Sequence, residues 1–374
     1  MLYLDHAATT PVRPAVAEAM APFWGDRFGN SSGVHGISRR AKNALEEARE
    51  QAGFLIGAQP QEIVFTGGGT EADNLALKGA ALAGAGRGEV VTAATEHEAV
   101  LEATHFLSRF GCPTAIVGVD RHGLVDPEEL KAAVTTDTAI VSVMAANNET
   151  GTIQPLAPLI RAVKSANPRA LFHTDAVQAF AALEVEVGAW EVDLLSLAAH
   201  KFGGPQGVGL LYVRNGVQLE PVLHGGGQEL GRRSGTHNVA GAIGMVRAME
   251  LATADRERFW RDTTEARRRF EAKLSDRADR NVPEELTLPQ HSHLRFGPID
   301  NETLLVLLDR QGVAASAGSA CASGAATVSH VLQSMGLTPE EARRSLRFSF
   351  GWTSTIDEAE QAAEIVLQCL ETMA

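Results

Sequence analysis

The sequence contains few aromatic residues and few cysteines. Only 5% of its 374 residues are aromatic, so its core must consist mainly of Ala, Val, Leu and Ile. The three cysteines, Cys112, Cys321 and Cys369, are an odd number without metal-site spacing, which argues against a disulfide framework. We therefore expect a reducing, cytoplasmic setting.

The sequence also lacks long apolar runs and an excess of positive charge. No run approaches the roughly 18 apolar residues of a membrane span, and the opening MLYLDHAATTP has no apolar secretory region. The formal net charge of −13 disfavours a broad face for nucleic acid. We expect neither membrane association nor direct binding of nucleic acid.

The length suits about two domains, and strand patterns alternate with helix patterns through the first part of the chain. Short β-branched runs recur between residues 63 and 213, which predicts crossovers and a mainly parallel sheet in an α/β fold. The arginine-rich stretch 250–280 indicates a long solvated helix or, alternatively, a docking site for an acidic partner. We predict a large cofactor-binding domain at 14–255 and a small α+β domain formed by 1–13 plus 256–374.

Three features of the large domain point to one kind of cofactor. The turn Gly67-Gly68-Gly69-Thr70 leads from a strand into a helix, where N–H groups can bind an anion, although a tight turn without a ligand is equally compatible. Lys201 follows an apolar strand; most lysines are solvated, but burial lowers a lysine pKa and makes the amine a Schiff-base nucleophile. Asp175 ends another strand, as a helix cap or as the partner of a cation. Pyridoxal phosphate requires such a lysine, carboxylate and phosphate cradle.

Other polar residues remain ambiguous from the sequence alone. His97 and the other histidines lack zinc spacing. Asn148 lies in a polar stretch after a buried strand, either in a turn or over a cofactor. Arg347, within a strand pattern, is a surface residue or a fork for a substrate carboxylate. Cys321 lies among small residues that suggest an exposed loop with a reactive thiol, whereas Cys112 and Cys369 fit a structural role.

The chain resembles the cysteine desulfurases of the NifS/IscS type through motifs that follow one another in the same order along nearly its whole length. These are fold-type I pyridoxal phosphate enzymes of the class V aminotransferase-like superfamily. The resemblance implies a large domain around a mainly parallel seven-stranded sheet and a smaller α+β domain with Arg347 and the Cys321 loop. The motifs that carry it are Tyr3 to Pro11, Phe28-Gly29-Asn30, the Gly-Gly-Thr-Glu turn, Glu96-His97, Asn147-Asn148-Glu149, Asp175 to Gln178, His200-Lys201, His224 to Glu229, Arg233 to Thr236, Gly318 to Cys321 and Leu346-Arg347.

The resemblance implies how the cofactor is held. Lys201 would bind it covalently, Asp175 would pair with its ring nitrogen, and Gln178 would donate to its ring hydroxyl. His97 would stack on the ring and take part in proton transfer. The residues expected around the phosphate are Gly69, Thr70, Ala198, Ala199, His200 and, from the other subunit of a homodimer, Thr236. Many relatives carry a hydroxyl where Ala198 stands and an alanine where Gly69 stands.

The resemblance also implies the reaction. Asn148 and Arg347 would hold the carboxylate of L-cysteine, and Lys201 would take the α-proton. Cys321 would accept the sulfur, which leaves L-alanine and a persulfide for an acceptor protein in iron–sulfur cluster assembly or thiolation; Cys321 could also transiently ligate a cluster. No resident metal is expected. The alternatives are a selenocysteine lyase or aminotransferase, and a non-catalytic sulfur-relay subunit.

Overall fold

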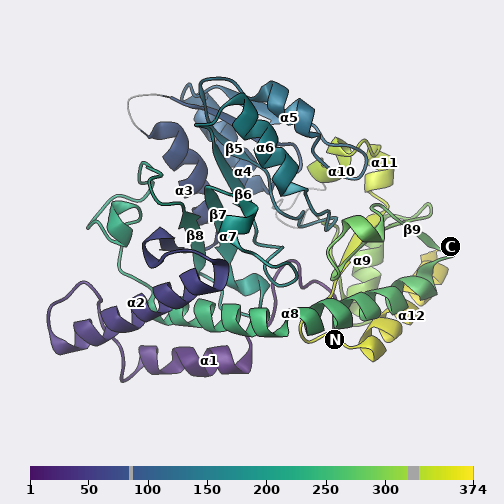
Figure 1. Cartoon of the computed structure of the whole chain (residues 1–374). Coiled ribbons are helices and arrows are strands. Elements are labelled where there is room, and N and C mark those ends of the chain that lie inside the picture. Colours follow the sequence, from purple (N-terminus) through teal and green to yellow (C-terminus); the bar gives the residue numbers. More distant parts are fainter. Residues whose placement is uncertain (84–86, 319–327, 374) are drawn as a thin grey trace.

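The chain forms a larger lobe around a central sheet and a smaller lobe at the C-terminal side, with α8 (Val239–Leu274) running along both (Figure 1). The computed structural model describes residues 1–83, 87–318 and 328–373. Most of the predicted strands are present. The helices of the larger lobe are α1 (Pro14–Met20), α2 (Gly36–Ile56), α3 (Gly69–Leu82), α4 (Glu98–Arg109), α5 (Pro127–Ala133), α6 (Leu156–Ala166) and α7 (Val187–Trp190).

The central sheet has seven strands in the order β2-β8-β7-β6-β5-β3-β4. The pairings among β7, β6, β5, β3 and β4 are parallel, whereas β8 runs antiparallel to both β2 and β7. The predicted mainly parallel sheet is therefore confirmed. Its strands are β2 (Ile63–Thr66), β3 (Glu89–Ala93), β4 (Thr114–Val117), β5 (Thr138–Ser142), β6 (Leu171–Asp175), β7 (Leu194–Ala198) and β8 (Gly209–Val213).

Helices cover both faces of this sheet. Buried side chains of α3 and α4 pack on one face, together with residues such as Ile140 and Leu194. Buried side chains of α2, α6 and α8 pack on the other face, with residues such as Val141 and Leu195. The alternation of consecutive strand residues between two apolar clusters is what a sheet buried on both faces requires.

The smaller lobe has its own apolar cluster and its own antiparallel sheet, in the order β12-β10-β9. The N-terminal strand β1 joins this lobe by pairing in parallel with β11, with Leu2 opposite Val313. The remaining elements are β1 (Leu2–Tyr3), β9 (Ala278–Arg280), β10 (His291–Phe296), α9 (Asn301–Arg310), β11 (Val313–Ala314), α10 (His330–Ser334), α11 (Pro339–Ala342), β12 (Ser345–Ser349) and α12 (Ile356–Met373).

The arginine-rich helix is longer and more buried than the sequence indicates. As α8 (Val239–Leu274) it begins about ten residues earlier than predicted, and its first half is buried against the larger lobe. In its second half Phe270 and Leu274 enter the core of the smaller lobe, and even the Arg267 side chain is buried. The predicted solvated helix is therefore amphipathic, and the predicted boundary at 255/256 lies within it.

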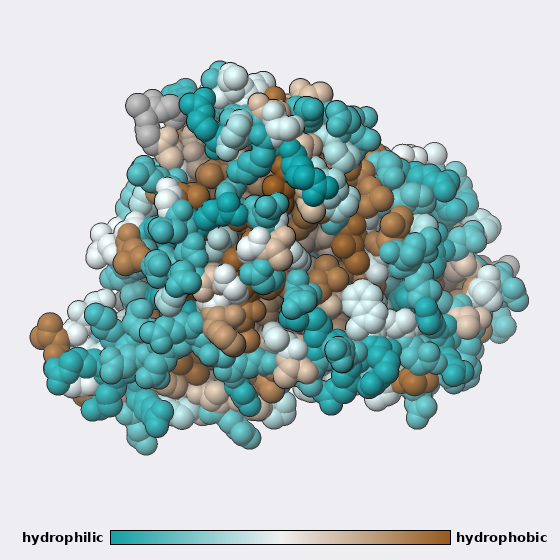
Figure 2. All heavy atoms as spheres, viewed as in Figure 1, coloured by the Kyte–Doolittle hydropathy of each residue, from teal (hydrophilic) through white to brown (hydrophobic). Residues whose placement is uncertain are grey.

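The face shown in Figure 2 is hydrophilic around most of its rim, and apolar side chains gather near its middle, between the two lobes. Within the described ranges, no helix combines the length and apolar character that a membrane crossing requires.

Candidate active site

The predicted site residues lie where the parallel strands end. Asp175 is the last residue of β6, and Asn148 follows β5. Lys201 closes the short 3₁₀ helix Ala199–Lys201 directly after β7, and His97 is the N-cap of α4 after β3. Because these strands are neighbours and parallel, their carboxyl ends bring together residues that are far apart in sequence. This edge is where ligands bind in open α/β sheets.

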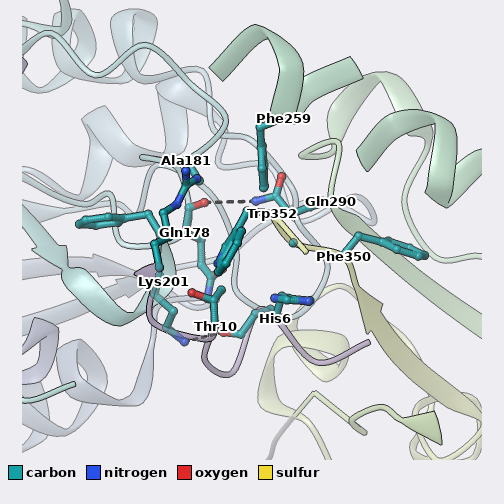
Figure 3. Close-up of a pocket in the computed structure, with 13 residues that line it drawn as sticks. His6, Thr10, Gln178, Ala181, Lys201, Phe259, Gln290, Phe350 and Trp352 are labelled. Atoms are coloured by element: carbon teal, nitrogen blue, oxygen red, sulfur yellow. Dashed lines mark hydrogen bonds between the residues drawn. The ribbon is translucent and has the colours of Figure 1, made fainter. Parts of the chain in front are cut away.

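The Lys201 side chain reaches the N-terminal segment (Figure 3). Its Nζ donates hydrogen bonds to the backbone oxygens of Ala7 and Ala8, the latter at 2.9 Å. The Gln178 amide also donates to the Ala7 oxygen, at 2.9 Å. A cavity beside Lys201 is lined by Thr10 and Gln178 from one side and by Trp352 from the other (Figure 3). The segment at residues 7–10 therefore forms one wall of the site.

Asp175, His97 and Lys201 form an electrostatic cluster. Burial raises the pKa of Asp175, and the nearby His97 and Lys201 oppose that shift, as does a hydrogen bond from the Val177 N–H at 2.8 Å. Burial lowers the pKa of His97, and Asp175 opposes this shift while Lys201 adds to it. His97 Nδ1 accepts the Ala99 N–H at 3.0 Å, so the proton of the neutral ring is on Nε2. The cluster supplies a buried carboxylate and an amine to one ligand.

The glycine turn opens into a hollow at the N-terminus of α3. Gly69 and Thr70, the first two residues of α3, line it together with His200. A Cβ at Gly69 would lie 3.1 Å from Val177 Cγ2 and 3.4 Å from Ala198 Cβ, so an alanine at position 69 would be tightly packed. Free N–H groups of the first helical turn and the helix dipole suit a phosphate group here.

Three other residues expected around the cofactor differ in position. Ala198 is the last residue of β7 and Ala199 begins the 3₁₀ helix that follows; both are buried, and the described lining of the hollow does not include them. Thr236 is exposed on a loop whose Arg233 forms an ion pair with Glu71, at 2.7 Å, next to the glycine turn. The contact of Thr236 across a dimer remains a prediction.

Arg347 is buried, although the sequence left a surface position equally open. Its Nη1 donates to the backbone oxygen of Asn148 at 2.8 Å, and its Nη2 lies 2.6 Å from Asp5 Oδ1. Its Nε has no hydrogen-bond partner among the described residues. Arg347 and Asn148 therefore adjoin each other, and the guanidinium still has a buried donor available for an anion.

The thiol expected to accept sulfur, Cys321, lies outside the described residues. Cys112 and Cys369 are free and buried, as the structural interpretation predicted. In the described part of the chain, no group of three or more His, Cys, Asp or Glu side chains is placed to hold a metal ion.

The described residues fit pyridoxal phosphate. An amine, a buried carboxylate close to it, and a helix N-terminus are the groups that this cofactor needs. Sequence reasoning gave no role to Asp5, to the backbone of Ala7 and Ala8, or to Glu71. The motif at residues 3–11 was the available signal, but it did not reveal these contacts.

Comparisons with known proteins agree with this geometry. The family model described as Aminotransferase class-V matches residues 2–361. The chain is 43% identical to "Cysteine desulfurase IscS" of Dictyoglomus turgidum (strain DSM 6724 / Z-1310), over 100% of this chain and 95% of that protein. It is 41% identical to "Cysteine desulfurase IscS" of Methanosarcina thermophila, over 100% of this chain and 92% of that protein.

A solved structure of a NifS-like protein superposes with a TM-score of 0.94 at 38% identity and covers 99% of both chains. Likeness of this extent in both sequence and fold spans the two lobes and the segment at residues 3–11. The chain therefore belongs to the class-V aminotransferase family of pyridoxal phosphate enzymes and, within it, to the cysteine desulfurases of the NifS/IscS type.

Proposed function

We propose that this pyridoxal phosphate-dependent cysteine desulfurase takes sulfur from L-cysteine onto Cys321 and passes it to an acceptor protein. The convergence of Lys201, Asp175 and His97 at the carboxyl ends of the parallel strands carries the proposal. An acceptor in iron–sulfur cluster assembly or thiolation fits the family. The homodimer, the cytoplasmic setting and the domain division at 13/14 and 255/256 belong to the same proposal.

Separate residues of the chain would bind the substrate and the cofactor. Arg347 and Asn148 bind the carboxylate of L-cysteine, since a guanidinium can fork onto two carboxylate oxygens. Bound pyridoxal phosphate supplies an electron sink for the electron pair released at the substrate α-carbon. Asp175 supplies a negative charge opposite the ring nitrogen, while the α3 N-terminus at Gly69 and Thr70 holds the phosphate.

Proton transfer falls to Lys201 and His97. The Lys201 amine takes the α-proton at Nζ and can return it to carbon as alanine forms. His97 is neutral near pH 7 because burial lowers its pKa, so its ring can stack on the cofactor and exchange a proton at Nε2. The Cys321 thiolate attacks the substrate sulfur, the substrate C–S bond breaks, and the sulfur remains on Cys321 as a persulfide.

The direct test is the product balance of the purified protein. With L-cysteine and a thiol reductant, we expect sulfide and alanine in equal amounts. The protein should be yellow, and borohydride should fix the cofactor to Lys201. Lys201→Ala should abolish both the borohydride-stable adduct and turnover.

Two substitutions of cysteine separate this proposal from its alternatives. Cys321→Ala should retain the cofactor but lose the persulfide, whereas the matched control Cys112→Ala should keep both. Full activity of Cys321→Ala would refute the sulfur-transfer step. Release of elemental selenium or selenide from L-selenocysteine by the unmodified protein, without sulfide release from L-cysteine, would favour a selenocysteine lyase.

A further inference from the structure

A row of buried polar side chains lies behind Asp175, on the sheet face that α3 covers. Three neighbouring strands each place an apolar residue on this face and a polar one two positions later. In the register Ser142 pairs with His173, whereas Ser196 pairs with Asp175, which lies two residues after His173 on the same face. The apolar and polar residues are Ile140 and Ser142 on β5, Leu171 and His173 on β6, and Leu194 and Ser196 on β7.

These side chains form a hydrogen-bonded chain with a direction. His173 Nδ1 lies 2.9 Å from Ser142 Oγ, and its Nε2 lies 3.0 Å from Ser196 Oγ. Burial lowers the pKa of His173 to about 3, so the ring is neutral, with one nitrogen donating and the other accepting. The two serines must therefore orient their hydroxyl groups in the same sense along the chain.

A buried acid stands at each end of this chain. Glu96 Oε2 lies 3.3 Å from Ser142 Oγ, while Oε1 accepts the Met144 N–H at 2.5 Å. Asp73, on α3, interacts with Ser196, and its Oδ1 lies 3.6 Å from His173 Nε2 with no hydrogen-bond partner in the described part of the chain. Both carboxyl groups are completely or almost completely buried.

Of the three carboxyl groups that share this buried region, Asp175 is the one in which His97 and Lys201 oppose the rise in pKa that burial causes. Burial raises the pKa of Asp73 and of Glu96, and repulsion from Asp175 acts in the same direction. Hydrogen bonds donated to the ionised carboxylates by serine and backbone N–H groups offset these shifts only in part, and the pKa of Glu96 is about 8. The titratable groups that face Glu96 are Asp175 and His173 on β6, Asp73 on α3 and His330 on α10, whose ring contacts the Glu96 backbone oxygen.

We propose that Glu96 and Asp73 are uncharged acids at the two ends of this Ser–His–Ser chain, and that they leave Asp175 as the one ionised carboxylate of the group. In this proposal the proton of Glu96 is on Oε2 and is donated to Ser142, the reverse of the donation from Ser142 that an ionised Glu96 would accept, and Ser142 donates to His173 Nδ1. His173 Nε2–H donates to Ser196, and Ser196 donates to Asp73. Under the proposed function, Asp175 then presents a single negative charge to the ring nitrogen.

The test is the pH dependence of stability of the full-length chain, measured by urea unfolding with and without pyridoxal phosphate. Native Glu96 holds a proton that the unfolded chain releases above a pKa near 4.5, so stability falls as pH rises between 6 and 7.5. Glu96→Gln keeps a donor toward Ser142 but removes the titrating proton. We expect the slope against pH to become less steep by the equivalent of about one proton.

Asp73→Asn should reduce the slope independently and in the same direction. The exposed Glu47→Gln on α2 is the matched control and should leave the slope unchanged. An unchanged slope for Glu96→Gln would show that Glu96 is ionised in the native protein and would overturn the proposal. Failure of Glu96→Gln to fold would overturn it as well, since a neutral donor would then not suffice. Loss of sulfide production alone would bear only on the proposed function.

Discussion

Shortening the guanidinium fork of Arg347 while keeping its charge tests the substrate-binding side of the site. In the structure Nη2 contacts Asp5 Oδ1 at 2.6 Å, Nη1 contacts the Asn148 oxygen at 2.8 Å, and Nε is left for a ligand. Arg347→Lys keeps one positive charge but cannot bind a carboxylate through two parallel bonds. We therefore expect weaker binding of L-cysteine with the cofactor still bound.

The magnitude follows from the lost contact. A hydrogen bond to a charged group contributes about 1.5–3 kcal/mol, and each 1.4 kcal/mol is about a tenfold change in affinity. Loss of one of two bonds to the substrate carboxylate should raise KM about 10- to 150-fold. The carboxylate is bound equally before and during the reaction, so kcat should change much less.

Asp5 provides a companion test, because its carboxylate occupies the same guanidinium. Two carboxylates on one buried guanidinium repel each other, so Asp5→Asn should lower KM for L-cysteine. Arg344→Gln, which removes an arginine paired with Glu340 near the surface, should leave KM unchanged. The assay is steady-state sulfide release over a range of L-cysteine concentrations. A lowered kcat at constant KM in Arg347→Lys would refute the reasoning.

Three further predictions concern stability and are checked by urea unfolding. Glu229→Ala removes one side of a buried ion pair in which Arg49 contacts both carboxylate oxygens, at 2.6 and 2.8 Å, and should lower the free energy of unfolding by about 3–5 kcal/mol. Adding Arg49→Met should restore part of that loss; a double variant no more stable than Glu229→Ala alone would contradict this. Leu230 is exposed, and its φ of 57° is a backbone conformation that is strained for leucine but not for glycine. Leu230→Gly should therefore stabilise the isolated chain by up to about 1 kcal/mol. A lower urea midpoint would contradict this expectation. Burial lowers the pKa of His291 and His293 to about 3 in the folded protein. As the pH drops from about 6.5 toward 3, these histidines bind protons in the unfolded chain but not in the folded protein, so the free energy of unfolding should fall. A flat profile in that range would show that these rings are not buried as neutral groups.

The pattern of neighbouring residues was sufficient to predict the strands, the glycine turn and the position of Lys201 directly after a strand. The β-branched runs and the turn before α3 are properties of adjacent residues, and the structure confirms them. The meeting of Asp175 with Lys201 was also expected, because carboxyl ends of neighbouring parallel strands share one edge. The roles of these residues in the reaction remain predictions.

Contacts between distant segments could not be read in the same way. Nothing near Arg347 in the sequence indicates that Asp5 neutralises it, and its burial depends on the pairing of β12 with β10. The sequence analysis gave no role to Asp73, which lies on α3 and is buried. The start of α8 was missed because Gly241 and Gly244 lower helix propensity, although at Gly244 close packing against Met20 and Pro205 requires a small residue.

The pairing of β1 with β11 has a consequence for how the enzyme matures. The ribosome makes Leu2 long before Val313, so the N-terminal strand has no partner until nearly the whole chain has been synthesised. The backbone of Ala7 and Ala8, which contacts Lys201, lies only a few residues beyond that strand. The sheet of the larger lobe can form during synthesis, but the wall beside Lys201 is completed last. In an unfinished nascent chain, Lys201 would then lie in a folded larger lobe but in an incomplete site. We therefore expect the larger lobe to fold before the enzyme becomes active.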